Sequence, residues 1–357
     1  MWNRIDLHNI TNFFFLEGYE FSSNIYAIVD DEITFIDAGN DYTAFYEFFE
    51  LGFDPFCVRG VILTHSHIDH SAGVYELLRY ESIRKNIQII LHENGSRTLM
   101  ETAQKLGAKV VKIKGFEKID AGQFRIFAIP TPGHTGDSMC LYIPDLDTIF
   151  TGDTVLPNAI AAPDPFVGGN LKDYVNSLRL LRSLKVKNCL PGHGKPIVGN
   201  GAKSIEETYE GVIMNLTDSR EYDEIVKKLI SLGYLEDAII YCDKILEKRE
   251  DLEIMLAKAS SLIHLYRCEE AIEILNKVLK MDSKNHMALI SMGYALMLMK
   301  KYFESIEFFD KALKIRYSPE ARIYKGIALT LMGKFEEAMK IPEFKENFEK
   351  FKSLGGF

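Results

Sequence analysis

The stretch THSHIDHSAG, residues 64–73, places three of the chain's nine histidines and one aspartate within six positions. Given the composition, chance would produce this spacing in only about three of ten thousand chains of this length. Imidazole nitrogens combined with a carboxylate suit zinc or iron better than magnesium or calcium. The stretch therefore predicts a transition-metal site formed by His65, His67, Asp69 and His70.

Three further candidate ligands each follow an apolar run that reads as a strand. They are His134 in FAIPTPGHTGDS, Asp153 in IFTGDT and His193 in CLPGHG. Glycine or proline flanks each one, as expected where a tight turn presents a side chain at a strand end. Seven ligands exceed the four positions of one tetrahedral zinc ion and suit two metal ions that share a carboxylate. The sequence therefore predicts a two-metal site.

The elements that must position these residues alternate in type up to about residue 200. Short β-branched runs predict strands, and the amphipathic segments between them predict helices. Such a mixture implies sheets covered by helices. The expected strands are 24–30, 32–37, 60–64, 87–92, 109–113, 124–129, 139–143, 148–152 and 187–192, and the expected helices are 42–52, 72–85, 96–107 and 171–184.

The rest of the chain is helical in pattern and repeats itself. Small residues recur at spacings of 33, 34 and 33, at Ala238, Ala271, Ser305 and Ala338. This pattern resembles the tetratricopeptide repeat, a helix-turn-helix unit whose neighbours stack to bury a shared core. We therefore predict a catalytic domain at 1–203, a connecting helix at 204–220, and about four repeats at 221–357 that end in a capping helix at 343–354.

The ligand series H-x-H-x-D-H, followed by His, Asp and His, resembles the metallo-β-lactamase superfamily and is most similar to its glyoxalase II-like hydrolases. The resemblance covers roughly residues 1–200. It implies an α/β fold, a four-layer αβ/βα sandwich with the metals at one edge of the sheets. It also implies that His65, His67 and His134 hold one metal, that Asp69, His70 and His193 hold the other, and that Asp153 bridges both. Asp37 stands where the family carries an aspartate that supports the ligands.

The resemblance also implies a chemistry. Two zinc ions, with iron or manganese as alternatives, would lower the pKa of a shared water from about 16 to roughly 7 and supply a hydroxide nucleophile. Asp69 is the residue expected to orient that hydroxide and to carry its proton. A small-molecule thioester, ester, lactone or amide would fit this machinery.

Two other classes of function compete with hydrolysis, namely oxidative chemistry and a scaffold role. Persulfide dioxygenases resemble the same motif series but use one iron ion. Flavodiiron proteins fit less well, because His67 stands where they place a glutamate. The other class is a scaffold, in which the repeats carry the function and the metal domain is catalytically minor. The repeats themselves are compatible with binding a protein or peptide partner and equally with self-association.

Charge and composition argue against several further classes. Residues 1–218 carry 19 Lys and Arg against 28 Asp and Glu, so the whole net charge of −9 lies there and no nucleic-acid partner is expected. No apolar run approaches the ~20 residues that span a bilayer, so we expect no membrane contact and a cytoplasmic location. The five cysteines are scattered, which predicts neither disulfides nor a thiolate zinc site.

Several neighbours of the motif invite a functional interpretation. The Pro- and Gly-rich segment 155–170 follows Asp153 and is expected to border the site. His92 ends an apolar run, but with seven ligands already present it is expected to be buried or supporting. Tyr174 is expected to pack in the core. The remaining histidines have no partner at a ligand spacing and are expected to be structural: His8, His264 and His286.

Overall fold

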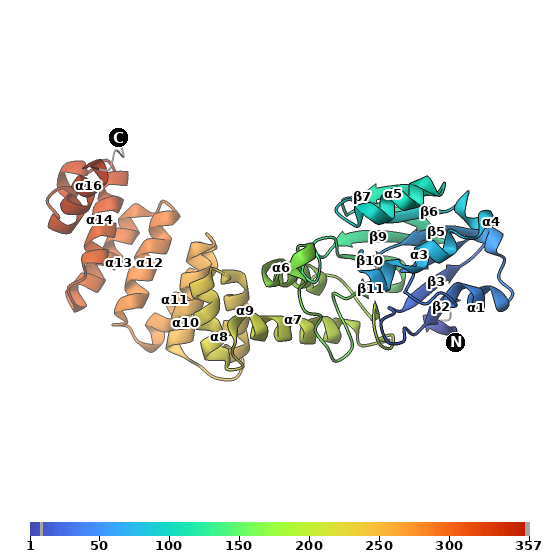
Figure 1. The fold of residues 1–357 in the computed structure, drawn as a ribbon. Coiled ribbons are helices and arrows are strands. Elements are labelled where there is room, and N and C mark those ends of the chain that lie inside the picture. The colour runs from blue at the N-terminus through green and yellow to red at the C-terminus, as the bar shows by residue number, and fades with distance from the viewer. Residues whose placement is uncertain (8–9, 354–357) are drawn as a thin grey trace. The chain divides into compact units, whose positions relative to one another are not determined.

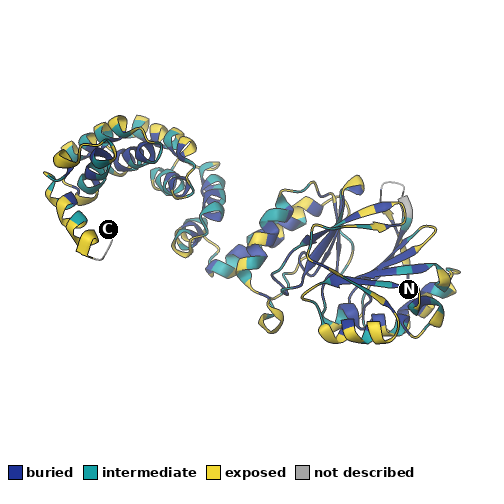
Figure 2. Cartoon of the chain, turned by 90° about the horizontal axis from the view of Figure 1, so that it is seen from above, coloured by how far each residue is buried: buried dark blue, intermediate teal, exposed yellow. Residues whose placement is uncertain are grey.

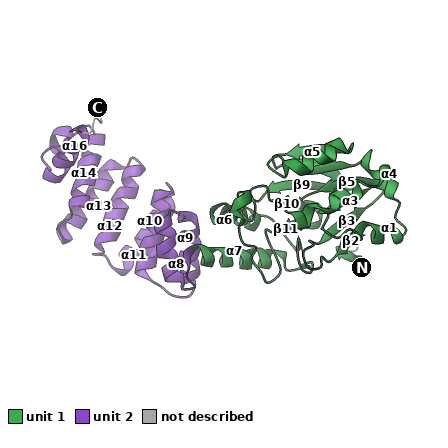
Figure 3. Cartoon of the chain, viewed as in Figure 1, with its two compact units in different colours: residues 1–216 green, residues 217–357 purple. Residues whose placement is uncertain are grey.

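The computed structural model describes residues 1–7 and 10–353 and divides into two compact units, Met1–Leu216 and Thr217–Phe357 (Figure 3). Their elements follow one another along the chain as labelled in Figure 1. Most of the predicted connecting segment 204–220 lies in helix α7 (Gly201–Thr217). The domain boundaries after residues 203 and 220 stay predictions. His8 lies outside the described residues.

The first unit contains a sheet of seven strands in sequence order. Strands β1 to β4 are antiparallel to one another, whereas β4 to β7 are parallel. The carboxyl ends of β4, β5 and β6 therefore meet at one edge. The strands are β1 (Asn3–Leu7), β2 (Ile10–Leu16), β3 (Ile25–Val29), β4 (Ile33–Ile36), β5 (Val58–Ile62), β6 (Gln88–His92) and β7 (Lys109–Ile113).

A second sheet of five strands packs on the first, in the order β12-β11-β10-β9-β8. Only β11 and β12 are parallel, and the other pairs are antiparallel. The strands are β8 (Lys118–Ala121), β9 (Phe124–Pro130), β10 (Met139–Ile143), β11 (Thr148–Gly152) and β12 (Asn188–Pro191). Short 3-10 helices stand at η1 (Pro55–Cys57), η2 (Pro144–Leu146) and η3 (Pro165–Val167).

Helices cover the outer faces of both sheets. On the first sheet, Phe45, Leu77 and Met100 of three helices share one core with Phe35 of β4. On the second sheet, the Cys189 thiol donates to the carbonyl of Gly201 at the start of α7. The predicted four-layer α/β sandwich is therefore confirmed. The helices of this unit, besides α7, are α1 (Ala44–Glu50), α2 (Ile68–Ser71), α3 (Gly73–Leu77), α4 (Glu81–Arg84), α5 (Arg97–Lys105) and α6 (Leu171–Arg182).

Strand β2 shows why part of the fold was not predicted. Phe13 and Phe15 point into the core between the sheets, whereas Phe14 and Leu16 point toward the helices, so both faces are buried. A strand buried on both faces has no alternation of apolar and polar residues, and its short apolar run fits a helix equally well. Strand β2 was not predicted for lack of such a pattern. The short strands β1 and β8 were not predicted either, although exposed residues alternate with less exposed ones in both.

The predicted helix at 72–85 is interrupted in the structure. Helix α3 ends at Leu77, and Tyr80 adopts an extended backbone conformation before α4 begins. The Tyr80 ring packs edge-on against Phe49, with ring centroids 5.6 Å apart. Both rings are partly buried against the core of the first sheet. The interruption of the helix therefore coincides with the packing of Tyr80 on this core.

The second unit consists of helices only in the part that the structure describes. Four helix pairs stack side by side along an arc, with buried residues between them, and α16 follows (Figure 2). The predicted helical repeat domain is confirmed. The helices are α8 (Tyr222–Leu232), α9 (Leu235–Leu246), α10 (Leu252–His264), α11 (Cys268–Met281), α12 (His286–Leu298), α13 (Tyr302–Ile315), α14 (Pro319–Leu331), α15 (Phe335–Ala338) and α16 (Pro342–Ser353).

The recurring small residues lie where helices of a pair touch. Ala238, Ala271, Ser305 and Ala338 have no exposed surface. A Cβ atom on Gly293 of α12 would lie 2.6 Å from the ring of Phe309 in α13, so only glycine fits there. Across residues 1–7 and 10–353, every helix is too short or too polar to cross a membrane.

Candidate metal centre

The sandwich edge gathers all seven predicted ligands from five loops and helices. His65 and His67 follow β5, and Asp69 and His70 lie in the short helix α2 directly after them. The other three each follow a strand of the second sheet. These are His134 after β9, Asp153 after β11 and His193 after β12. Residues up to 128 positions apart along the chain therefore meet at one place.

Three imidazoles form a first cluster, which we call the His65 group: His65, His67 and His134. Nδ1 of His67 lies 3.1 Å from Nε2 of His65 and 3.0 Å from Nε2 of His134. Three nitrogens that converge on one point are the arrangement of zinc and iron sites. One ring offers Nδ1 and the other two offer Nε2.

A second cluster, the His70 group, consists of Asp69, His70 and His193. Oδ2 of Asp69 lies 3.1 Å from Nε2 of His193 and 3.6 Å from Nε2 of His70. Asp153 lies between the two groups. Its Oδ2 is 3.6 Å from Nε2 of His134 and equally 3.6 Å from Nε2 of His193.

Two buried atoms of this centre lack an ordinary partner. Nε2 of His70 and Oδ1 of Asp153 are 3.3 Å apart, yet neither makes a hydrogen bond within the described residues. Unpaired buried polar atoms cost free energy, typically about 1 to 3 kcal/mol each. A cation between them would satisfy both, so the residues present fit a metal centre.

The rings are held by hydrogen bonds on their outer nitrogens. Asp37 Oδ2 accepts from Nδ1 of His70 at 2.8 Å, and its Oδ1 accepts from the backbone N–H of Thr64 at 2.7 Å. The carbonyl of Ala162 accepts from Nδ1 of His134 at 2.7 Å. Asp164 Oδ2 lies 3.1 Å from Nε2 of His67. Such bonds fix the tautomer and leave the inner nitrogen free to ligate.

Burial and charge pull the pKa values in this centre apart. Burial lowers the pKa of His65 well below its usual value, with repulsion from His70 acting in the same direction. Burial also disfavours charged His70, but the carboxylates of Asp153 and Asp37 raise its pKa well above the usual value. Asp153 is buried too, and the neighbouring His70 holds its pKa low. His65 is thus neutral and Asp153 ionised, the states in which they act as ligands, whereas His70 would release a proton on binding a metal ion.

An open pocket of about 470 Å³ adjoins the His65 group. His67 and Ser66 form one side, and Phe166 and Val167 of η3 form another. The Phe166 side chain is almost fully exposed. This volume falls within the usual range for small-molecule sites, about 300 to 1,000 Å³.

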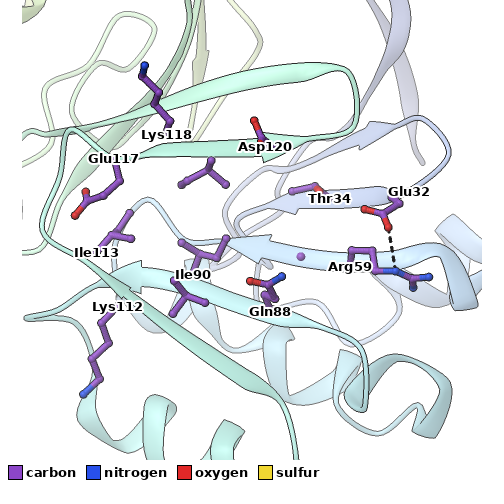
Figure 4. Close-up of a pocket in the computed structure, with 13 residues that line it drawn as sticks. Glu32, Thr34, Arg59, Gln88, Ile90, Lys112, Ile113, Glu117, Lys118 and Asp120 are labelled. Atoms are coloured by element: carbon purple, nitrogen blue, oxygen red, sulfur yellow. Dashed lines mark ion pairs between the residues drawn. The ribbon is translucent and has the colours of Figure 1, made fainter.

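A second cleft of about 500 Å³ lies away from the candidate metal centre. It starts at the amino ends of β5 and β6 and extends between the outer strands β7 and β8 (Figure 4). An ion pair of 3.2 Å between Arg59 and Glu32 stands at its rim. None of the described residues that line it carries an imidazole or a thiol, so it offers no comparable ligand set.

The segment 155–170 borders the centre, but the two residues that contact imidazoles were not singled out from the sequence. Ala162 acts through its backbone carbonyl, which no side-chain pattern reveals. Asp164 stands in a D-P-F turn that reads as an ordinary loop. Tyr174 is buried, and its hydroxyl donates to the carbonyls of Asp153 and Thr154. His92 accepts from the backbone N–H of Asn94 and joins neither group.

Comparison with known families agrees with the geometry. The family model of the metallo-beta-lactamase superfamily matches residues 18–193, which include all seven ligand candidates and Asp37. Residues 18–193 belong to that superfamily. A tetratricopeptide repeat model matches residues 288–319, in the second unit. Both predicted resemblances are confirmed.

Individual relatives match parts of the metallo-beta-lactamase domain. The chain is 31% identical over 144 residues to an atrochrysone carboxyl ACP thioesterase of Aspergillus fumigatus, covering 40% of each protein. It is 34% identical over 151 residues to the mitochondrial hydroxyacylglutathione hydrolase of Saccharomyces cerevisiae, covering 38% of this chain and 48% of that one. These relatives support the prediction of a metal-dependent hydrolase.

The matches leave much of each relative uncovered. The chain spans between 28% and 40% of the length of three of the curated relatives that it matches. Among solved structures, a metallo-beta-lactamase family protein from Thermus thermophilus is 19% identical with a TM-score of 0.44, covering 63% of this chain and 93% of that one.

Proposed function

We propose that the protein is a dinuclear metal hydrolase. In this proposal the His65 group would hold one ion, the His70 group would hold the other, and Asp153 would serve both. The observation that carries it is the convergence of both groups on Asp153, together with the unpaired buried atoms of His70 and Asp153. Zinc suits these nitrogen and carboxylate ligands, and iron and manganese are compatible with them.

Such ions, when bound, lower the pKa of water from about 16 to roughly 7 and polarise a substrate carbonyl. The chain's own residues would orient the reactants. Asp69 suits a proton carrier, because its side chain is one-quarter exposed and its Oδ2 lies within 3.1 Å of His193. Partial burial raises the pKa of Asp69, but the hydrogen bond to His193 lowers it further, so the carboxylate is ionised at neutral pH and free to accept a hydrogen bond.

A thioester is the substrate class that we favour, with esters and lactones as the alternatives. Two relatives of the same domain support this choice, the thioesterase and the hydroxyacylglutathione hydrolase named above. The pocket beside His67 is lined by both polar and apolar side chains, including Ser66, Asn94 and Phe166. Such a lining suits an acyl group with polar substituents.

The oxidative alternative needs only one iron ion. Because persulfide dioxygenases resemble the same ligand series, metal content and oxygen uptake, rather than the ligand set, separate this alternative from hydrolysis. The scaffold alternative predicts a damaged centre, whereas all seven ligand side chains are present and close together. We propose in addition that the repeats bind a protein partner or a second copy of this chain.

The proposal is tested by purifying the full chain without added metal and quantifying bound metals. We expect two zinc ions per chain and turnover of thioesters from a panel that also holds lactones and phosphodiesters. His193→Ala should hold one ion and lose turnover, whereas His264→Ala, an exposed histidine of the repeats, should change neither. A wild-type protein with one iron ion and oxygen uptake would refute the hydrolase in favour of the oxidative alternative.

A further inference from the structure

The loop between β11 and α6 contacts two of the three rings of the His65 group. The carbonyl of Ala162 accepts from Nδ1 of His134 at 2.7 Å, and Asp164 Oδ2 meets Nε2 of His67 at 3.1 Å. The backbone N–H of Asp164 also donates to the carbonyl of His134 at 2.7 Å. Asp164 is thus hydrogen-bonded to the backbone of His134 through its own N–H and to the imidazole of His67 through its carboxylate.

His67 differs from the other two rings of the group in the nitrogen that it points inward. It points Nδ1 at the other two nitrogens, whereas His65 and His134 point Nε2. A neutral imidazole that ligates through Nδ1 must carry its proton on Nε2. An acceptor placed at Nε2 selects this tautomer and prevents the ring from flipping.

We propose that Asp164 is a positioning residue that holds His67 in the Nε2–H tautomer and aims its Nδ1 at the metal position. This inference rests on the proposed two-metal function. Asp164 neither lines the pocket beside His67 nor belongs to the His65 or His70 group, so it acts through His67.

The carboxylate of Asp164 is itself fixed. Its Oδ1 accepts from the backbone N–H of Phe166 at 2.9 Å and caps η3, which leaves Oδ2 for His67. The carbonyl of Asp164 accepts from the backbone N–H of Gly169 at 2.7 Å. A side chain restrained at both ends orients a ligand better than a free one, because less conformational entropy is lost when the ligand binds.

The chain contains a matched turn that lacks this second role. Asp54, Pro55 and Phe56 repeat the D-P-F sequence, and Asp54 Oδ1 accepts from the N–H of Phe56 at 2.8 Å to cap η1. Asp54 is exposed, and no imidazole of the described residues is hydrogen-bonded to it. Capping therefore uses one carboxylate oxygen in both turns, and the bond to His67 is additional in the second.

The Asp164→Asn substitution in the full chain separates the capping of η3 from the hydrogen bond to His67. Asparagine caps helices about as well as aspartate, so the turn should survive. With its oxygen on Phe166, the amide NH₂ would face the N–H of His67, so the acceptor is lost. We expect zinc at one of the two positions to bind roughly 10- to 100-fold more weakly, measured by competition with a chromophoric chelator. Asp54→Asn should bind both ions as the wild type does.

A second measurement does not depend on metal. In metal-free protein, the ¹⁵N shifts of the His67 ring should report the Nε2–H tautomer in the wild type and in Asp54→Asn, and its loss in Asp164→Asn. Unchanged zinc affinities and an unchanged tautomer in Asp164→Asn would overturn the inference and leave the proposed function standing. A wild type that binds no metal, but whose His67 tautomer depends on Asp164, would support the positioning role and refute the two-metal function.

Discussion

The contact between Asp37 and His70 offers a quantitative test of the second metal position. Asp37 is almost fully buried and has a left-handed backbone, with φ of +57°. Its Oδ2 accepts from Nδ1 of His70 at 2.8 Å and from the hydroxyl of Thr64 at 2.8 Å. Asp37→Asn should fold, because asparagine tolerates this backbone conformation and can still accept from the N–H of Thr64.

The size of the effect follows from the bond that is lost. A hydrogen bond to a charged group contributes about 1.5 to 3 kcal/mol, and replacing Oδ2 by NH₂ removes the acceptor for His70. If this free energy supports the ligating form of His70, zinc at its position should bind roughly 10- to 150-fold more weakly. Stepwise chelator competition on the purified Asp37→Asn protein measures this loss, and total zinc at saturation should still approach two ions per chain.

Asp41 supplies a matched control for this experiment. Its Oδ1 also accepts from a threonine N–H and hydroxyl, those of Thr43, at 2.8 and 2.9 Å, but it is exposed and bonds no histidine in the described part of the chain. Asp41→Asn should leave both zinc affinities unchanged. Equal affinities in wild type, Asp37→Asn and Asp41→Asn would refute the reasoning that Asp37 orients a ligand.

Two further predictions concern stability. Burial raises the pKa of Cys140 to about 11 from 9.0, so the folded state binds the thiol proton more tightly than the unfolded state does. The free energy of unfolding should therefore fall with rising pH, by about 2 kcal/mol between pH 8 and 10.5. Urea unfolding at both pH values checks this, and Cys140→Ala should show a fall smaller by that amount; an equal fall would contradict it. In the repeats, Gly293→Val should force α12 away from Phe309 and cost about 1 to 3 kcal/mol by urea unfolding followed by circular dichroism. Ser291→Val in the same helix should cost clearly less, and equal losses would show that crowding against Phe309 is not the cause.

The sequence was most informative where function depends on residue type and local spacing. His65, His67, Asp69 and His70 stand within six positions, and the later ligands each follow a recognisable strand. The structure then shows that β4 to β6 are parallel, which brings their carboxyl ends to one edge. The repeats were equally clear, because a fixed period of small residues reflects the close approach of paired helices.

Other features depend on contacts between distant parts of the chain. Strand β2 is apolar on both faces, so its pattern carries no period that identifies a strand. Asp164 and Asp54 stand in the same D-P-F sequence, yet only Asp164 reaches an imidazole, 97 positions away in the chain. The types and order of the candidate ligands were thus determined by the sequence alone. Which nitrogen each ring presents, and which neighbour holds it there, was decided only by the tertiary structure, because hydrogen bonds depend on distance and direction in space rather than on separation along the chain.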